Sequence, residues 1–376
     1  MSFELFDLAS AAGAEQVSFA ADPSTGLRAV VAVHSTVLGP ALGGTRFYPY
    51  VRERAAFVDV LRLAQGMTYK HAIAGNRLGG GKGVIIGDPA TLRTDDLIRG
   101  YGRFVDRLGG RYLTAEDVGT TTADMDLIRT VTRYVTGVSV EAGGSGDPSP
   151  ATAWGVLHSM CAVAERLWGD DSLEGRRVVV SGVGKVGMSL VGHLRDRGVH
   201  VAVADVRPAA VADAVERYGA TAVDVETAPT VECDIFSPCA LGAVLDQTTI
   251  PALRCAAVCG AANNQLAEPE DAHRLAARGI LYAPDYVANA GGVINIHGEA
   301  LGEPYDRDAA FAQVERIRDT LLEIFQIAEA KGLTTAEAAD HLAEDRIAAA
   351  GASAAATSGG EPDSAPSIAS PSNVRQ

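Results

Sequence analysis

Apolar residues along this chain recur with two alternating periods, one typical of strands and one typical of helices. In the first 140 residues the pattern predicts strands at 27–36, 82–88 and 111–120, and helices at 53–75 and 94–110. Thr94, followed by two aspartates, is a helix-start signal, and a pair of glycines ends the same helix. Residues 37–50, "VLGPALGGTRFYPY", are rich in Gly and Pro, so we expect a loop there.

The second half of the chain alternates more regularly. Helix-like runs occur at 151–169, 184–198, 209–219 and 269–279, and strand-like runs at 176–183, 199–206, 233–239, 255–263 and 280–287. Strands that alternate with helices of this length predict a parallel sheet covered on both faces. Residues 306–350 read as helical, with a strongly amphipathic run at 309–332.

A chain of 376 residues suits two domains. The segment 141–150, "EAGGSGDPSP", breaks the pattern and marks a domain boundary or a hinge. We therefore predict an α/β fold of two domains, an N-terminal α/β domain and a Rossmann domain, with an active-site cleft between them. Residues 351–376 are rich in Ser, Ala, Gly and Pro and have few bulky apolar groups, which predicts a disordered tail.

A dinucleotide fingerprint carries the Rossmann prediction. Gly182-x-Gly184-x-x-Gly187 follows a predicted strand directly and opens a predicted helix. The glycines permit a tight turn, close approach of a pyrophosphate and close packing of helix on strand. Asp205, at the end of the next strand, can accept the ribose hydroxyls and would repel a 2′-phosphate, which favours NAD over NADP. Arg207 beside it weakens that preference a little.

Composition excludes several function classes. The formal net charge of −15 argues against a nucleic-acid binder. Five cysteines without a CxxC pair indicate free thiols in a reducing compartment and no zinc site, and we expect no metal. Neither a signal peptide nor an uncharged apolar run long enough to span a membrane is visible, so we expect a cytoplasmic protein.

Two lysines stand out in "MTYKHAIAGNRLGGGKG". The chain has four lysines against 28 arginines, and Lys70 and Lys82 are two of the four. A phosphate loop would need Gly and Ser or Thr where Asn76 and Gly83 stand, so that motif fails. An amine buried in a glycine-rich turn beside a second cation should have its pKa lowered from ~10.4 to ~7–8, which suits a general base. Arginine cannot lose its proton in this range.

Two carboxylates follow the strand at 111–120. Glu116 and Asp117 are adjacent, so they point to opposite faces and only one can serve a given site. Spacing alone leaves open which one it is, and whether either merely caps the next helix. A 2-hydroxy acid dehydrogenase would instead need a histidine as acid and base, for which His71 is the best candidate. A non-catalytic dinucleotide sensor would be expected to have lost the lysines.

Taken together, seven motifs resemble the glutamate/leucine/phenylalanine/valine dehydrogenase superfamily over roughly residues 34–305. They are "LGGTR", "MTYKHAIAG", "GGGKG", "TAEDVGT", "GDPSPATAWGV", "GVGKVG" and "GAANNQL" followed by "PDYVANAGGVIN". Within the superfamily the chain is most similar to branched-chain amino acid dehydrogenases of the valine type. The resemblance implies a homo-oligomer that uses NAD and converts an L-amino acid to its 2-oxo acid, ammonia and NADH.

The resemblance also implies roles for individual residues. Lys82 would activate water, Lys70 would hold the substrate carboxylate, and Asp117 rather than Glu116 would carry the protons of the amino group. The implied cofactor contacts are Thr152, Gly182, Val183, Gly184, Lys185, Val186, Gly187, Met188, Asp205, Ala240 and Asn263. The implied substrate contacts beyond Lys70 are Leu42, Gly43, Gly44, Met67, Ala115, Thr136, Asn263, Val293 and Ile296.

The same resemblance divides the work between the domains. Residues 1–140, completed by helices at 325–350, would hold the substrate, and residues 141–324 would hold NAD. Leu42 stands where glutamate enzymes place a lysine, so an aliphatic side chain is expected, and Ala115 disfavours a bulky ring. One methylene changes discrimination by only ~1–3 kcal/mol. Valine is therefore the first expectation, with leucine or phenylalanine as alternatives.

Overall fold

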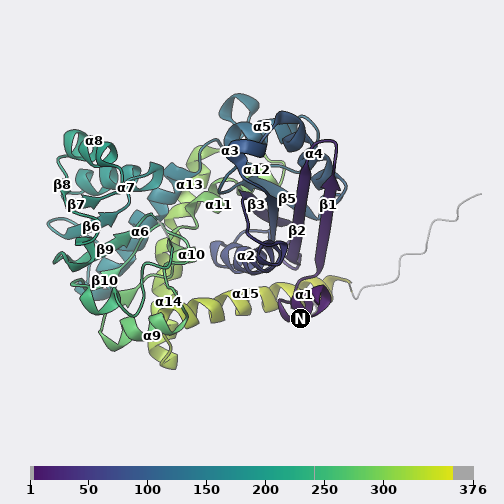
Figure 1. The fold of residues 1–376 in the computed structure, drawn as a ribbon. Coiled ribbons are helices and arrows are strands. Elements are labelled where there is room, and N and C mark those ends of the chain that lie inside the picture. Colours follow the sequence, from purple (N-terminus) through teal and green to yellow (C-terminus); the bar gives the residue numbers. More distant parts are fainter. Residues whose placement is uncertain (1–3, 241, 359–376) are drawn as a thin grey trace, which may run out of the picture.

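The computed structural model describes residues 4–240 and 242–358. Two separate sheets form the centres of two lobes, and helices from the C-terminal third lie between and beneath them (Figure 1). The fold is therefore α/β with two lobes, as the pattern predicts.

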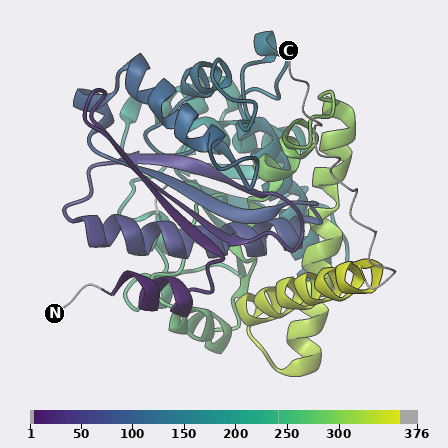
Figure 2. The same ribbon diagram turned by 90° about the vertical axis from the view of Figure 1, so that its right-hand side faces the viewer.

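The N-terminal lobe contains a five-stranded mixed sheet in the order β1-β2-β4-β3-β5. Its strands are β1 Gln16–Asp22, β2 Leu27–Ser35, β3 Ala41–Tyr48, β4 Gly79–Ile86 and β5 Tyr112–Glu116. Its helices are α1 Leu5–Ala11, α2 Glu53–Ala74, α3 Pro89–Leu92, α4 Asp95–Asp106 and α5 Thr122–Arg129. Strand β2 runs antiparallel to β1 and β4, whereas β3 is parallel to β4 and β5. Helix α2 lies across one face, and α4 and α5 cover the other (Figure 2).

The prediction of a loop at 37–50 is wrong for most of that segment, because Ala41–Tyr48 forms β3 between β4 and β5. Its glycines allow neighbouring backbones to pack closely. A Cβ at Gly43 would lie 1.7 Å from the carbonyl oxygen of Gly81 on β4. Composition therefore suggested a loop where the glycines serve a tightly packed inner strand. Strand β1 was also missed.

The second lobe contains a six-stranded parallel sheet in the order β11-β10-β9-β6-β7-β8. Its strands are β6 Arg177–Ser181, β7 His200–Ala204, β8 Thr221–Ala222, β9 Ile235–Pro238, β10 Ala257–Val258 and β11 Leu281–Tyr282. The helices are α6 Ser149–Trp168, α7 Lys185–Asp196, α8 Pro208–Tyr218 and α9 Glu270–Ala277, with 3-10 turns at Val140–Ala142, Ala228–Thr230 and Ile250–Ala252. The order reverses beside β6, and in open α/β sheets ligands bind at such a switch point.

Six further helices follow β11 and join the lobes. They are α10 Asp285–Ala288, α11 Gly291–Asn295, α12 His297–Ala300, α13 Arg307–Glu315, α14 Ile317–Lys331 and α15 Thr335–Ser358. Helices α10 and α11 contact both α2 and α6, and α15 runs from β11 to α2 beneath the N-terminal lobe (Figure 1). The run expected as one helix at 309–332 is divided at Arg316. Helix α15 continues to Ser358, so residues 351–358 of the expected disordered tail are helical, and 359–376 lie outside the described residues.

A buried hydroxyl network fixes β3 against its neighbours. The Thr45 side chain is fully buried, and its Oγ1 lies 2.6 Å from both Tyr101 Oη and Thr114 Oγ1. The Thr45 carbonyl also accepts a hydrogen bond from Thr120 Oγ1 at 2.9 Å, in the loop that follows β5. The network thus holds that loop against the end of the sheet.

Replacing Thr45 by valine keeps the shape of the side chain but removes its hydroxyl. The buried hydroxyls of Tyr101 and Thr114 then lose a hydrogen-bond partner, so the fold should be destabilised by about 1–3 kcal/mol. Chemical denaturation would measure the change. Thr91→Val, at an exposed threonine, is the matched control and should stay within about 0.5 kcal/mol of the parent. Equal effects of the two substitutions would contradict a role for the network.

Candidate active site

A cavity of about 410 Å³ lies between the two lobes. Residues of β3, α2, β4 and β5 line it from the N-terminal lobe, and residues of α6, α7, α10 and α11 line it from the other side. Twelve of the predicted site residues take part in its wall. They are Leu42, Gly44, Met67, Lys70, Lys82, Ala115, Asp117, Thr152, Val186, Asn263, Val293 and Ile296.

Lys82 lies inside β4, opposite Ala32 of β2. The strand expected to begin at residue 82 begins at Gly79, so the glycine-rich turn expected around the lysine is part of the strand. Only 5% of the residue is exposed. Burial is the largest influence, and together with the positive charges of Arg46 and Lys70 it lowers the pKa of this amine to about 7. Its Nζ contacts Asp117 Oδ2, and this carboxylate works in the opposite direction by favouring the ammonium form.

Lys70 lies on α2 with its side chain in the same cleft. Burial lowers the pKa of its amine to about 8, and the charge of Asp285 opposes this shift. Asp285 belongs to α10 of the other lobe, and its Oδ2 accepts the Gln265 backbone N–H at 2.9 Å. Burial raises the pKa of the Asp285 carboxyl. The two lobes therefore contribute opposite charges to one end of the cleft.

The two adjacent carboxylates both line the cavity but have different partners. Asp117 contacts Lys82, and its Oδ1 accepts the Val118 backbone N–H at 2.5 Å. Glu116 instead accepts a hydrogen bond from Thr122 Oγ1 at 2.8 Å, in the first turn of α5. The cap of that helix is Thr121. Of the two acids, Asp117 is therefore the one in contact with the buried amine.

An apolar cluster forms another part of the cleft wall. Leu42, Ala115 and Ile296 are buried in one cluster, and Met67 packs against it. Leu42, Gly44 and Arg46 alternate along β3 and all line the cavity, as side chains on one face of a strand do.

The glycine turn between β6 and α7 has the shape that a dinucleotide requires. A Cβ at Gly187 would lie 2.0 Å from the Gly182 carbonyl oxygen, and one at Gly182 would lie 2.6 Å from the Ala240 Cβ. A Cβ at Gly184 would meet only Arg207, at 4.0 Å, so space is open in front of that backbone and the N-terminus of α7. Asp205 Oδ2 accepts the Val183 backbone N–H at 2.9 Å. These features fit a bound dinucleotide.

Some of the predicted site residues do not line the cavity. Gly43 and Thr136 do not line the cavity: the Gly43 carbonyl accepts the Tyr112 hydroxyl at 2.6 Å, and Thr136 Oγ1 donates to the Ile296 carbonyl at 3.4 Å. Lys185 Nζ lies 3.1 Å from Asp147 Oδ2 in the segment expected as a hinge. Of the cofactor set, Gly182, Val183, Gly184, Lys185, Gly187, Met188, Asp205 and Ala240 also lie outside the cavity wall.

Other lining residues were missed from the sequence. They are chiefly Arg46, Asn264, Asp285 and Asn289. Arg46 stands two residues after Gly44, so a strand prediction for β3 would have placed it on the lining face. Asn289 Nδ2 donates to Asn263 Oδ1 at 2.8 Å, which ties α10 to the loop carrying Asn263. His71, the alternative acid and base, is fully buried, and burial lowers its pKa to about 3.

Comparison with known proteins agrees with this geometry. A family model described as "Glu/Leu/Phe/Val dehydrogenase, dimerisation domain" matches residues 14–134. A second, "Glutamate/Leucine/Phenylalanine/Valine dehydrogenase", matches 143–215 and 208–354. The chain belongs to this family. It is an oxidoreductase that acts on CH–NH2 donors.

Similar relatives span nearly the whole chain. A leucine dehydrogenase from Geobacillus stearothermophilus is 51% identical over 92% of this chain and 93% of its own length. A valine dehydrogenase from Streptomyces albus is 52% identical over 90% and 93%. Among solved structures, L-tryptophan dehydrogenase from Nostoc punctiforme has a TM-score of 0.80 at 45% identity, covering 92% of this chain and 99% of that one. A hetero-hexameric glutamate dehydrogenase from Thermus thermophilus has a TM-score of 0.75 at 26% identity, covering 92% and 94%.

Across residues 4–240 and 242–358, no helix is long and apolar enough to cross a membrane. The same range holds no group of three or more His, Cys, Asp or Glu side chains suited to a metal ion.

The depressed pKa of Lys82 predicts a pH-dependent stability effect. The amine titrates near 7 when folded and near 10.5 when unfolded. The unfolded chain therefore binds more protons between these values, and the lysine costs stability as the pH falls from about 10 to about 7. Lys82→Met removes this cost. As the pH falls from about 10 to about 7, the free energy of unfolding of the variant should therefore rise relative to that of the parent by up to roughly 4 kcal/mol, and below pH 7 the difference should stay constant.

Thermal or chemical unfolding between pH 6 and 10 would measure the difference. Lys331→Met, at an exposed lysine on α14, controls for loss of a lysine as such. A stability difference between Lys82→Met and the parent that does not vary with pH would contradict the assigned pKa.

Proposed function

We propose that this protein catalyses the reversible, NAD-dependent oxidative deamination of a branched-chain L-amino acid to its 2-oxo acid, with release of ammonia. Valine is the first candidate. Leucine is the alternative, because relatives of both kinds are equally similar to this chain. The observation that carries the proposal is the pair of amines with lowered pKa values, Lys70 and Lys82, beside Asp117 in a cleft that also has an apolar wall.

Substrate binding follows from the two ends of the cleft. Lys70 would pair with the α-carboxylate, since an ammonium in a low-dielectric site attracts a carboxylate strongly. The cluster of Leu42, Ala115 and Ile296 would take an aliphatic side chain and leave a charged one unpaired there. Together these two contacts fix the orientation of the α-carbon.

The chemical steps then use the remaining groups. A bound nicotinamide ring supplies the acceptor for the hydride that leaves the α-carbon. Lys82, uncharged above pH about 7, would take a proton from the water that attacks the resulting iminium carbon. Asp117, in contact with Lys82, would carry protons to and from the nitrogen. Closure of the lobes would exclude bulk water during these steps.

We also propose NAD as the cofactor, because the Asp205 carboxylate stands at the end of β7 beside the glycine turn. Its ion pair with Arg207, Nε to Oδ1 at 3.1 Å, partly neutralises that carboxylate and would leave some tolerance for a 2′-phosphate. In this division of work, residues 1–140 with the helices of 325–350 hold the amino acid and 141–324 hold NAD.

We further propose a cytoplasmic homo-oligomer. Two names support the oligomer: the matched N-terminal family is described as a dimerisation domain, and the similar glutamate dehydrogenase from Thermus thermophilus is hetero-hexameric.

A substrate panel tests the function. NADH formation, followed by absorbance with L-valine, L-leucine, L-phenylalanine, L-tryptophan, L-glutamate and lactate, should be fastest with valine or leucine and very slow with glutamate. Lys82→Arg should fold normally and lose turnover with every substrate, because a guanidinium keeps its proton. Activity with lactate alone, or with none of the compounds, would overturn the proposal, as would substantial turnover by folded Lys82→Arg.

A further inference from the structure

Arg46 is a half-buried cation that the proposed reaction does not yet use. It lies on β3 with 22% of its side chain exposed, and it lines the cleft. Its Nε is buried without a hydrogen-bond partner and lies 3.8 Å from Asp117 Oδ1. The guanidinium thus faces one oxygen of Asp117, while Lys82 contacts the other.

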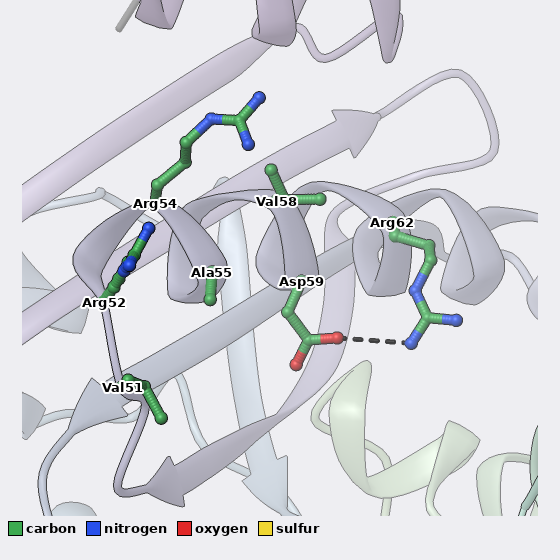
Figure 3. Close-up of a pocket in the computed structure, with 7 residues that line it drawn as sticks. All are labelled: Val51, Arg52, Arg54, Ala55, Val58, Asp59 and Arg62. Carbon is green, nitrogen blue, oxygen red and sulfur yellow. Dashed lines mark hydrogen bonds and ion pairs between the residues drawn. The ribbon is translucent and has the colours of Figure 1, made fainter.

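A second carboxylate holds the guanidinium in this position. Arg46 Nη1 donates to Asp59 Oδ2 at 2.9 Å, and the Tyr50 hydroxyl donates to the same oxygen at 2.5 Å. Asp59 lies on α2, where its other oxygen accepts a hydrogen bond from Arg62 Nη2 at 3.3 Å (Figure 3). Because two arginines share Asp59, its single negative charge does not neutralise Arg46 completely.

The charges around Lys82 come from β3, α2 and the loop after β5, whereas its neighbour across the strand pair, on β2, is Ala32. Arg46 reaches it from β3, Lys70 and Asp59 from α2, and Asp117 from the loop after β5. After burial, the Arg46 charge is the largest influence that lowers the pKa of Lys82, whereas Asp59 raises it. Arginine keeps its charge throughout the working pH range, so its influence is constant.

We propose that Arg46 is a positioning residue for the dehydrogenase reaction: braced by Asp59 and Tyr50, it orients the Asp117 carboxylate and keeps a fixed positive charge beside Lys82. This inference rests on the proposed roles of Lys82 and Asp117. The fixed charge favours the uncharged amine that must accept a proton from water. The contact with Asp117 keeps one oxygen turned to Arg46 and the other to Lys82 and the cleft.

The test is the pH profile of kcat/KM for the amino acid, which reports the ionisations of the free enzyme. Arg46→Gln removes a positive charge, so the acidic limb should move to higher pH by about one unit. Asp59→Asn removes a negative charge and the brace, so the limb should move to lower pH. Arg46→Lys keeps the charge but loses the planar fork, so the limb should stay near that of the parent while kcat falls.

Arg28→Gln is the matched control, because Arg28 also pairs with an acid of α2, Glu53, but on the exposed surface. It should leave both the limb and the turnover unchanged. Opposite shifts in Arg46→Gln and Asp59→Asn support the inference, since a role in packing alone would not move the limb in opposite directions. Absent or same-direction shifts in folded variants overturn it.

The design separates this inference from the proposed function. If the parent enzyme shows no amino-acid-dependent reduction of the dinucleotide, the proposed function itself fails. If the parent is active and the limb does not move, only the role of Arg46 fails. Should Arg46→Gln not fold, the Arg46→Lys profile decides: an unchanged limb with a lower kcat supports the inference, and a parental kcat or a shifted limb overturns it.

Discussion

The burial of one amine, that of Lys82, is the constraint on which the rest of this structure depends. A lysine that is 5% exposed inside a sheet is unfavourable as an ammonium, and Arg46 and Lys70 increase that cost. The negative charge of Asp59 opposes this shift, and Asp117 contacts the amine directly. The balance places the pKa near neutrality, where a group can both accept and release a proton. Such a site is costly to stability, and it lies on the glycine-rich strand β4, which pairs with β2 on one side and β3 on the other.

The two lobes meet where their chemistry is complementary. The N-terminal lobe supplies the lysines, Asp117 and most of the apolar wall, and the parallel sheet supplies the glycine turn at its switch point. Helices α10 and α11 contact α2 and α6, so the chain after β11 connects the two halves of the cleft. Asp285 on α10 faces Lys70 on α2. Electrostatic attraction therefore acts across the boundary between the lobes.

Much of this could be predicted from the sequence. The βα alternation indicated the parallel sheet, and the scarcity of lysine singled out Lys70 and Lys82, both of which line the cleft. The failures have physical causes. The glycines of β3 permit close strand packing, which composition cannot distinguish from a loop, and Lys82 was placed in a turn for the same reason. Arg46 was missed as a consequence, because its place depends on β3 being a strand, and its brace on Asp59 joins residues that only the tertiary fold brings together.

The most direct test of this account is a titration of Lys82 itself. With only four lysines in the chain, isotope labelling of lysine side chains gives an NMR spectrum simple enough to assign by substitution. The signal lost in Lys82→Arg should, in the parent, titrate with a midpoint near pH 7. A midpoint near 10.5, the value of an ordinary lysine, would contradict the general-base role assigned to this amine.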